Sequence, residues 1–182
     1  MHLGSQVTIT TDASPWGMGG ILEVNGKIQE FFAEDLEPDV ACILKIPVGK
    51  ASGQQVAEAF AMLIALRLWQ KTLRSVRSFL HVKSDSRSAL SLILTMKSSG
   101  YGNNLIAREV ALDIAQACYV PQVVAHVPGV SNVSADTLSR LSQPGKQYRI
   151  PDHLAKVHRA HLPHPHKQIF RTLDAIPRCI VP

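Results

Sequence analysis

Four acidic residues combine a chemically useful side chain with an apolar setting. Asp12 and Asp85 each end a run typical of a β-strand, and Glu58 and Asp136 each interrupt an apolar helical stretch. An unpaired charge near a core is unfavourable, so a fold that gathers several carboxylates usually holds a metal ion with them. If the four converge, they suit a pair of divalent cations and phosphoryl-transfer chemistry.

Ordinary structural roles are open to the same residues. Asp12 fits a turn at the end of a strand, and Asp85 fits the N-cap of a helix that begins at Ser86. Glu58 and Asp136 fit acidic positions on a solvated helix face. Against that interpretation of Glu58, its sequence neighbours are almost all apolar, so nearly every orientation leaves the carboxylate beside apolar surface.

Hydrophobic periodicity predicts the elements that would position these side chains. The predicted strands are Gln6–Thr11, Ile21–Val24, Lys27–Phe32, Val76–Ser84 and Pro121–His126. The predicted helices are Gly53–Thr72, Ser86–Met96, Asn104–Tyr119 and Asn132–Leu141, with residues 33–52 as a long loop and Gly100-Tyr101-Gly102 as a break. Asn25-Gly26 is a hairpin signal, and Asn132 is a good N-cap. The order predicts an α/β fold with a five-stranded mixed sheet flanked by helices.

The bulk composition fits one domain with an appendage. The chain has 182 residues, of which 46% are apolar, enough for a core. No apolar run reaches the roughly 18 residues of a membrane span, and no signal-peptide pattern opens the sequence, so no membrane partner is expected. Cys42, Cys118 and Cys179 form neither an even disulfide set nor a metal-binding pair, which favours an intracellular setting, in the cytoplasm or the nucleus.

The net charge is concentrated at the C-terminal end. Residues 142–182 hold seven Lys/Arg and two Asp/Glu, which accounts for the whole net charge of +5. We therefore expect a domain over residues 6–141 and a basic, Pro/His-rich tail or linker over 142–182, partly disordered, with a short helical pattern near 152–160. Such a tail suits a polyanion such as nucleic acid, or serves solubility. Zinc binding is disfavoured by the irregular spacing of the tail histidines, His153, His158, His161, His164 and His166.

Four stretches resemble a known family. They are Asp-Ala-Ser-Pro-Trp-Gly-Met-Gly-Gly at 12–20, Glu58 with the apolar residues after it, Asp85-Ser86, and the stretch from His126 to Arg140. The last is close to the signature His-x-Pro-Gly-x-x-Asn-x-x-Ala-Asp-x-Leu-Ser-Arg, which is highly specific. Over residues 6–141 the chain resembles the ribonuclease H domain attached to reverse transcriptases of retrotransposons and related elements.

The resemblance implies an activity and its catalytic residues. Such a domain hydrolyses the RNA strand of RNA/DNA hybrids during reverse transcription, and two Mg²⁺ ions, for which Mn²⁺ can substitute, are held by Asp12, Glu58, Asp85 and Asp136. One ion would activate a water and the other would stabilise the leaving 3′ oxygen. His126 would shuttle protons or assist product release; alternatively, it fixes the Pro-Gly turn by hydrogen bonds.

The resemblance also implies partners. Ser14, Gly17, Ser86, Arg87 and Asn132 are the expected substrate-binding residues, with RNA distinguished from DNA by its 2′-hydroxyls; Arg87 also fits a plain surface cation. The partners would be the hybrid and a polymerase domain of the same polyprotein. One alternative is a catalytically inactive module of the same fold that binds nucleic acid or that polymerase domain. Another is a different nuclease substrate, as in integrase-like or resolvase-like enzymes.

Overall fold

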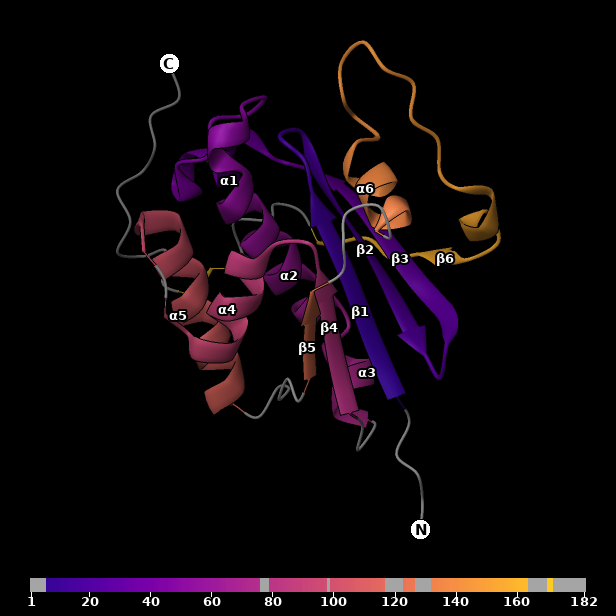
Figure 1. The fold of residues 1–182 in the computed structure, drawn as a ribbon, viewed down its shortest axis with the longest axis horizontal. Coiled ribbons are helices and arrows are strands. Elements are labelled where there is room, and N and C mark those ends of the chain that lie inside the picture. Colours follow the sequence, from indigo (N-terminus) through magenta and orange to yellow (C-terminus); the bar gives the residue numbers. More distant parts are fainter. Residues whose placement is uncertain are drawn as a thin grey trace.

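A single mixed sheet forms the centre of the molecule (Figure 1). The computed structural model describes residues 6–75, 79–97, 99–116, 123–126, 132–163 and 170–171, and the fold is described for these residues. The strand order is β5-β4-β1-β2-β3-β6. The strands are β1 (Gln6–Ala13), β2 (Gly17–Val24), β3 (Lys27–Asp35), β4 (Phe79–Ser84), β5 (Val123–His126) and β6 (His158–Arg159). The five expected strands are confirmed within the described residues, whereas residues 76–78 and 121–122, where the fourth and fifth were expected to begin, lie outside them. β6 is a short addition from the C-terminal segment.

Both pairing modes occur in the sheet. β1, β2 and β3 form an antiparallel meander, whereas β4 runs parallel to β1 and β5 runs parallel to β4. The β2–β3 turn is the expected Asn25-Gly26 hairpin, in which both residues have positive φ, 51° and 75°. Two consecutive positive φ values match a type I′ turn, whose twist suits the flanking strands.

Helices cover both faces of the sheet. They are α1 (Pro38–Leu44), α2 (Gln54–Leu68), α3 (Gln70–Ser75), α4 (Arg87–Thr95), α5 (Tyr101–Ala115) and α6 (Val133–Ser139), with 3₁₀ turns η1 (Ala51–Gly53) and η3 (Asp152–Leu154). In Figure 1, α1, α2, α4 and α5 lie on one side of the sheet and α6 lies on the other. The larger apolar core surrounds α2, whose residues 57–66 are all buried.

The expected loop over 33–52 is wrong. β3 continues to Asp35, and a helix and a 3₁₀ turn follow within this range. Pro38 stands at the first helical position, where its missing N–H costs nothing, and Val40, Ala41 and Leu44 are buried. An apolar pattern this short was masked in the sequence by the prolines and acids on either side of it.

Two helix boundaries also differ from expectation. The predicted Gly53–Thr72 helix is broken at Trp69 into α2 and α3. The Trp69 ring packs against Phe32 at a centroid distance of 5.7 Å, and its indole N–H donates to Glu30 at 2.9 Å, so a tertiary anchor ends the helix there. Gly102 does not break a helix but lies within α5, where an added Cβ would stand 2.5 Å from the Leu44 carbonyl oxygen.

The C-terminal segment packs onto the sheet. Leu154 is fully buried with Ile21, Phe31 and Leu138 in a second apolar cluster, on the α6 side. Beyond it β6 pairs with β3, and the Ala160 N–H donates to the Phe31 carbonyl at 2.8 Å. The helical pattern near 152–160 therefore forms only the turn η3 before the chain becomes extended.

A second contact of the segment lies on the opposite side of the sheet. Phe170 is buried and stacks on Phe60 of α2 at 5.6 Å. Arg171 pairs with Glu109 and Asp113 of α5, which also bind Arg67 of α2. The segment thus contacts both layers of helices.

One cysteine forms a disulfide bond, and the helices that the structure describes are unsuited to crossing a membrane. Cys42 of α1 is disulfide-bonded, and the other two cysteines, Cys118 and Cys179, lie outside the described residues. The spacing did not suggest a disulfide, because bonding depends on proximity in space. None of the helices in the described part of the chain has the length and apolarity needed to cross a membrane.

Candidate active site

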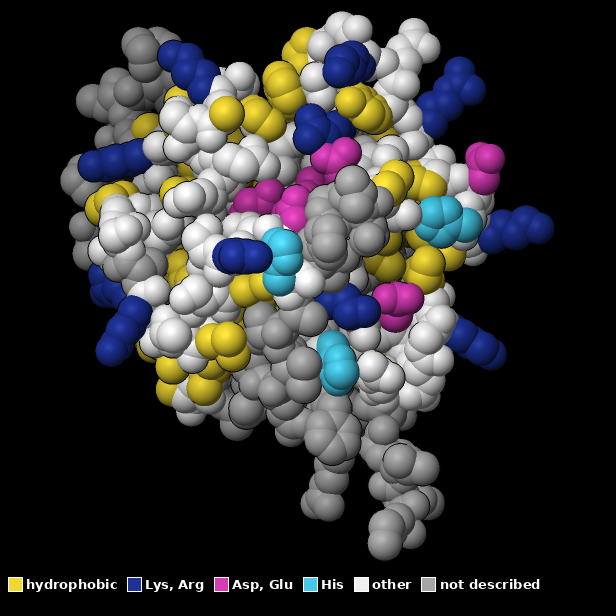
Figure 2. Space-filling view, viewed as in Figure 1, with side chains coloured by type: hydrophobic (Ala, Val, Ile, Leu, Met, Phe, Trp, Pro, Cys, Tyr) yellow, Lys and Arg dark blue, Asp and Glu magenta, His cyan; other side chains and the backbone are white. Residues whose placement is uncertain are grey.

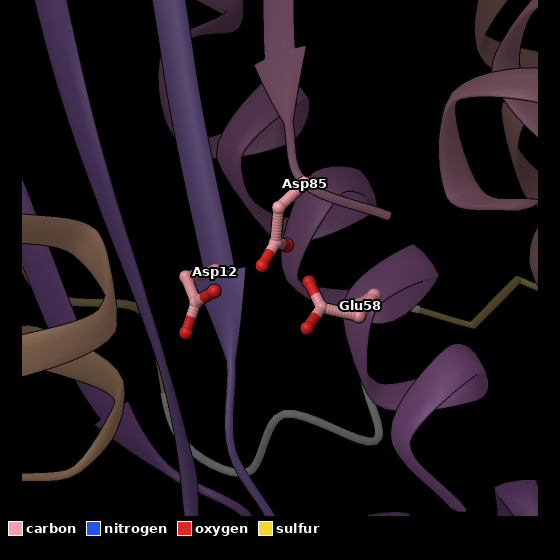
Figure 3. Close-up of side chains that lie close together, drawn as sticks. All are labelled: Asp12, Glu58 and Asp85. Atoms are coloured by element: carbon pink, nitrogen blue, oxygen red, sulfur yellow. The ribbon is translucent and has the colours of Figure 1, made fainter. Parts of the chain in front are cut away.

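Three of the four expected carboxylates meet at one edge of the sheet. Oxygen atoms of Asp12, Glu58 and Asp85 all lie within 4.8 Å of one another. Figure 3 shows the three side chains pointing toward a common centre, from β1, from α2 and from the end of β4. In Figure 2, Asp and Glu side chains gather near the middle of one face, with Lys, Arg and His side chains around them.

Strand register explains the meeting of Asp12 and Asp85. β1 and β4 are parallel neighbours, and their last aligned pair is Thr10 with Lys83. Both aspartates follow that pair by the same number of residues, so both emerge at the same end of the sheet. Glu58 reaches the two aspartates from a helix. It lies one turn after the start of α2, which packs against β1.

The cluster is electrostatically unfavourable without a cation. Burial raises the pKa of Asp12 to about 7; the Ser139 hydrogen bond opposes this rise, and the charges of Asp85 and Asp136 add to it. Burial, followed by the charges of Asp12 and Asp85, raises the pKa of Glu58 to about 9. Three carboxylates gathered under these conditions favour a bound cation, which removes their mutual repulsion.

The surroundings of Glu58 fit such an ion. Its side chain is buried, and the Gln54 amide donates to its Oε1 at 2.8 Å. The other oxygen, Oε2, is buried and has no hydrogen-bond partner among the residues that the structure describes. A buried acceptor that lacks a donor is costly, and a hard divalent cation with oxygen ligands satisfies it. The residues present therefore fit a Mg²⁺-type ion.

Neutral donors from α6 fix Asp12. The Ser139 hydroxyl donates to Oδ2 at 2.8 Å, and the Asn132 amide stands 3.4 Å from Oδ1. Asn132 also donates to the Thr11 carbonyl at 3.2 Å. Asn132 occupies the N-cap position of α6, but its side chain makes no capping hydrogen bond. Its amide donates to residues of β1 instead.

The fourth carboxylate, that of Asp136, lies beside the cluster and forms an ion pair with an arginine. Asp136 is not among the carboxylates that lie within 4.8 Å of one another. Arg140, one turn further along, donates to its Oδ1 at 2.7 Å. Partial burial lowers the pKa of Arg140, but the hydrogen bond and charge of Asp136 outweigh this effect and raise it. The charge of Asp136 nevertheless reaches Asp12, whose pKa it raises.

Asp85 and His126 border an open cleft. Ser86, and not Asp85, is the N-cap of α4, accepting from the Ala89 N–H at 3.3 Å, so the Asp85 carboxylate is not the cap. His126 pairs with Ser84 in the β4–β5 register, and its Nε2 lies 3.0 Å from the Asp85 carbonyl oxygen. Because a carbonyl only accepts, Nε2 is the donor in this contact. The cleft measures about 640 Å³ and is lined by Gln54, Gln55, Glu58, Asp85, Ser86, Arg87, Ser88 and His126.

The expected substrate-binding residues divide into two groups. Ser86 and Arg87 line the cleft. Ser14, Gly17 and Asn132 are buried in the fold instead. The Ser14 hydroxyl donates to the Ser139 carbonyl at 2.6 Å and accepts from the Gly17 N–H at 3.1 Å, so it holds the β1–β2 turn against α6.

Two residues in the site had no role assigned from sequence. Gln54 donates to both Glu58 and the Ala13 carbonyl, and so ties α2 to the end of β1. The signal was its position four residues before Glu58, on the same helix face. Ser139 follows Asp136 by three residues, and only the packing of α6 on β1 reveals that it reaches Asp12.

Solved structures share this fold. LC11-RNase H1, in complex with an RNA/DNA hybrid, is similar with a TM-score of 0.53 and 18% sequence identity, over 73% of this chain and 93% of that chain. RNase H1 from the halophilic archaeon Halobacterium salinarum NRC-1 is similar with a TM-score of 0.50 and 17% identity, over 75% of this chain and 96% of that chain. No protein-family model matches, and neither does any curated protein. At these identities the likeness concerns the fold: the chain has a ribonuclease H fold.

Proposed function

We propose that this protein is a metal-dependent ribonuclease H that hydrolyses the RNA strand of RNA/DNA hybrids. The observation that carries the proposal is the meeting of Asp12, Glu58 and Asp85 within 4.8 Å, with one buried Glu58 oxygen unpartnered. The fold supports it, since a protein of the same fold, LC11-RNase H1, was solved in complex with an RNA/DNA hybrid.

The metal ligands in this proposal are the four carboxylates predicted from the sequence. Two divalent ions, Mg²⁺ or Mn²⁺, would supply a water nucleophile at neutral pH and stabilise charge on the leaving oxygen. Asp12, Glu58 and Asp85 would hold the ions from the cluster, and Asp136 would join them by exchanging its Arg140 contact for a cation.

The chain's other residues orient this site. Ser139 and Asn132 fix the Asp12 carboxylate, and Gln54 fixes Glu58. His126 lines the cleft and would shuttle protons during turnover. Ser86 and Arg87 line the same cleft and would contact the hybrid near the scissile phosphate.

We further propose a retroelement setting, in which the domain works beside a reverse transcriptase polymerase domain of the same polyprotein. The support is the stretch from His126 to Arg140, which keeps the full spacing of the retroelement signature. Supplying such a polymerase domain in the same chain should raise hybrid cleavage. Equal cleavage with and without it would contradict this part of the proposal.

The test of the activity is cleavage of a labelled RNA/DNA hybrid in Mg²⁺ or Mn²⁺. Wild type should cut only the RNA strand, and Asp85→Asn should cut at least about a hundredfold more slowly, because a metal ligand is lost. Glu23→Gln is the matched control, since Glu23 lies toward the far end of β2, paired with Thr8. Binding without cutting by wild type would instead indicate the catalytically inactive module.

A further inference from the structure

The loop that follows α6 presents two cations beside the candidate active site. This loop, residues 142–151, contains Lys146 and Arg149, both exposed, with half-buried Tyr148 between them. Tyr148 lies within electrostatic range of Arg140, the partner of Asp136. Figure 2 shows Lys and Arg side chains over this part of the molecule, on the face that also exposes the acidic cluster.

The loop is built into the fold at both ends. At its start the Ser142 hydroxyl donates to Asp35 of β3, and the Gln143 N–H donates to the Arg140 carbonyl at 2.9 Å. At its end the chain enters η3, where Leu154 is fully buried. Both ends of the loop are therefore anchored to the fold.

A tight turn presents the first cation. The Lys146 N–H contacts the Gln143 carbonyl at 3.4 Å, and Gly145 has a φ of 75°. Pro144 and Gly145 at the two central positions match a type II turn, for which glycine is needed. The turn places Lys146 directly after it, at an exposed position.

The charges of this loop are not used within the fold. Lys146 and Arg149 form no ion pair with any residue that the structure describes, whereas Arg140 and Arg159 bind Asp136 and the Ala33 carbonyl. Residues 1–141 are neutral overall, so uncompensated positive charge begins after α6. Two exposed cations that have no ion-pair partner in the described part of the chain, near a proposed site for phosphodiester chemistry, suit phosphate groups.

We propose that Lys146 and Arg149 form a second contact surface for the RNA/DNA hybrid, binding backbone phosphates outside the catalytic cleft. This inference rests on the proposed function and adds a binding surface to it. The surface would hold the duplex on the α6 side, while the cleft engages the scissile phosphate. It supplies a net positive charge, which residues 1–141 lack because their acidic and basic residues balance.

The test compares two charge-reversal variants. Lys146→Glu/Arg149→Glu should weaken hybrid binding on the order of tenfold near 0.1 M salt and reduce the slope of log affinity against log salt by about 2. Lys27→Glu/Lys71→Glu, the control, makes the same charge change at the opposite end of the sheet from Asp12. There Lys27 pairs with Val24, which in turn pairs with Val7 near the start of β1. Screening at that distance should leave binding within about twofold of wild type.

Affinity is measured by fluorescence anisotropy with the Asp85→Asn change in every protein, so that no cutting occurs. Steady-state cleavage is then measured without that change, and the loop variant should raise KM but keep kcat, because the loop touches no reacting atom. The neutral pair Lys146→Gln/Arg149→Gln should give a smaller loss in the same direction. A lowered kcat would instead indicate damage transmitted through Arg140, and would overturn the proposal.

The outcomes separate this inference from the proposed function. If wild type cuts the hybrid and the loop variant binds like the control, the contact surface is refuted and the nuclease stands. If wild type binds hybrid through these cations but never cuts it, the surface stands and the nuclease is refuted.

Discussion

At the scale of single residues, the donors bonded to Asp12 and Glu58 in the described chain are neutral. Ser139 and Asn132 reach Asp12, and Gln54 reaches Glu58. A hydroxyl or an amide orients a carboxylate without placing a positive charge beside it, so it leaves the position of a cation open. An arginine in their place would put a positive charge where a cation would bind, as the Arg140–Asp136 ion pair does at the fourth carboxylate.

Removing one such donor should weaken the site without unfolding it. Ser139→Ala deletes the hydrogen bond to Asp12, and bonds to charged groups contribute about 1.5–3 kcal/mol. We expect a loss of roughly ten- to a hundredfold in kcat/KM, together with a higher Mg²⁺ concentration for half-maximal rate. Isothermal calorimetry of Mg²⁺ binding gives a readout independent of turnover.

Thr137→Ala is the matched control for this change. The Thr137 hydroxyl donates to the Val133 carbonyl at 2.8 Å within α6 and touches none of the carboxylates. It should retain wild-type metal binding. Ser139→Thr, which keeps a hydroxyl, should recover part of the loss; equal Mg²⁺ affinity in Ser139→Ala and wild type would refute the positioning role.

The raised pKa values predict how the stability of the metal-free protein depends on pH. Burial chiefly raises the pKa of Asp12 from 3.8 to about 7 and that of Glu58 from 4.5 to about 9. Between these values the folded protein binds more protons than the unfolded chain, so stability is greatest at low pH in this window and is lost as pH rises. We expect Tm in EDTA to fall from about pH 5 to about pH 9.

Two comparisons isolate the cause of this pH dependence. Glu58→Gln should flatten the fall in Tm above about pH 7, since its neutral side chain does not ionise. Mg²⁺ should raise Tm at about pH 8 in wild type by binding only the folded state. A Tm in EDTA that rises over the same range would contradict the assigned protonation of the cluster.

At the scale of elements, the sequence predicts best those turns and strands that depend only on neighbouring residues. The Asn25-Gly26 hairpin and the strands ending near Asp12 and Asp85 depend on turn and strand signals that need no tertiary information. Asp12 and Asp85 were each expected to end a strand, which allowed the two carboxylates to meet. The structure confirms the strands and this meeting.

Other features depended on packing between distant elements. α1 was hidden by flanking prolines, and the break at Trp69 depends on its contacts with Phe32 and Glu30. The use of Ser14 and Asn132 inside the fold was also invisible, because both bond partners that lie far away in sequence. Periodicity cannot indicate which hydroxyl faces which carboxylate.

The contact between β2 and α6 tests how the elements set the site. A Cβ at Gly19 would stand 2.5 Å from the Leu138 Cβ and 2.7 Å from the Ala135 carbonyl oxygen. Gly19→Ala should therefore push α6 outward, at a cost of about 1–3 kcal/mol. Since α6 carries Ser139 and Asp136, we expect lower turnover as well as lower Tm, measured by hybrid cleavage and thermal melting.

Val133→Ala is the control for the glycine change. Val133 also lies on α6 but is 62% exposed, so its truncation should alter neither turnover nor Tm appreciably. Wild-type turnover in Gly19→Ala would show that the position of α6 does not matter to the site.

At the scale of the whole molecule, the segment after α6 completes the packing of the sheet. Leu154 is fully buried against Ile21, Phe31 and Leu138. Leu154→Ala should destabilise the protein by about 2–5 kcal/mol, measured by urea unfolding. Truncation after residue 141 should lower the stability further, because it exposes this whole apolar cluster.

Leu112→Ala serves as the matched control, since Leu112 is 37% exposed on α5 and should lose much less stability. If the fragment ending at residue 141 proves as stable as the full chain, the division into a domain and a separate tail, as predicted from charge and composition, is correct.

The hydrogen bond between Asp12 and Ser139 joins residues 127 positions apart. A chain leaves the ribosome from its N-terminus, so Asp12, Glu58 and Asp85 are all exposed to the cell before α6 exists. During that interval the carboxylates lack the donors that orient Asp12. A product stopped by a nonsense codon before α6 therefore carries the three carboxylates without the donors that orient Asp12.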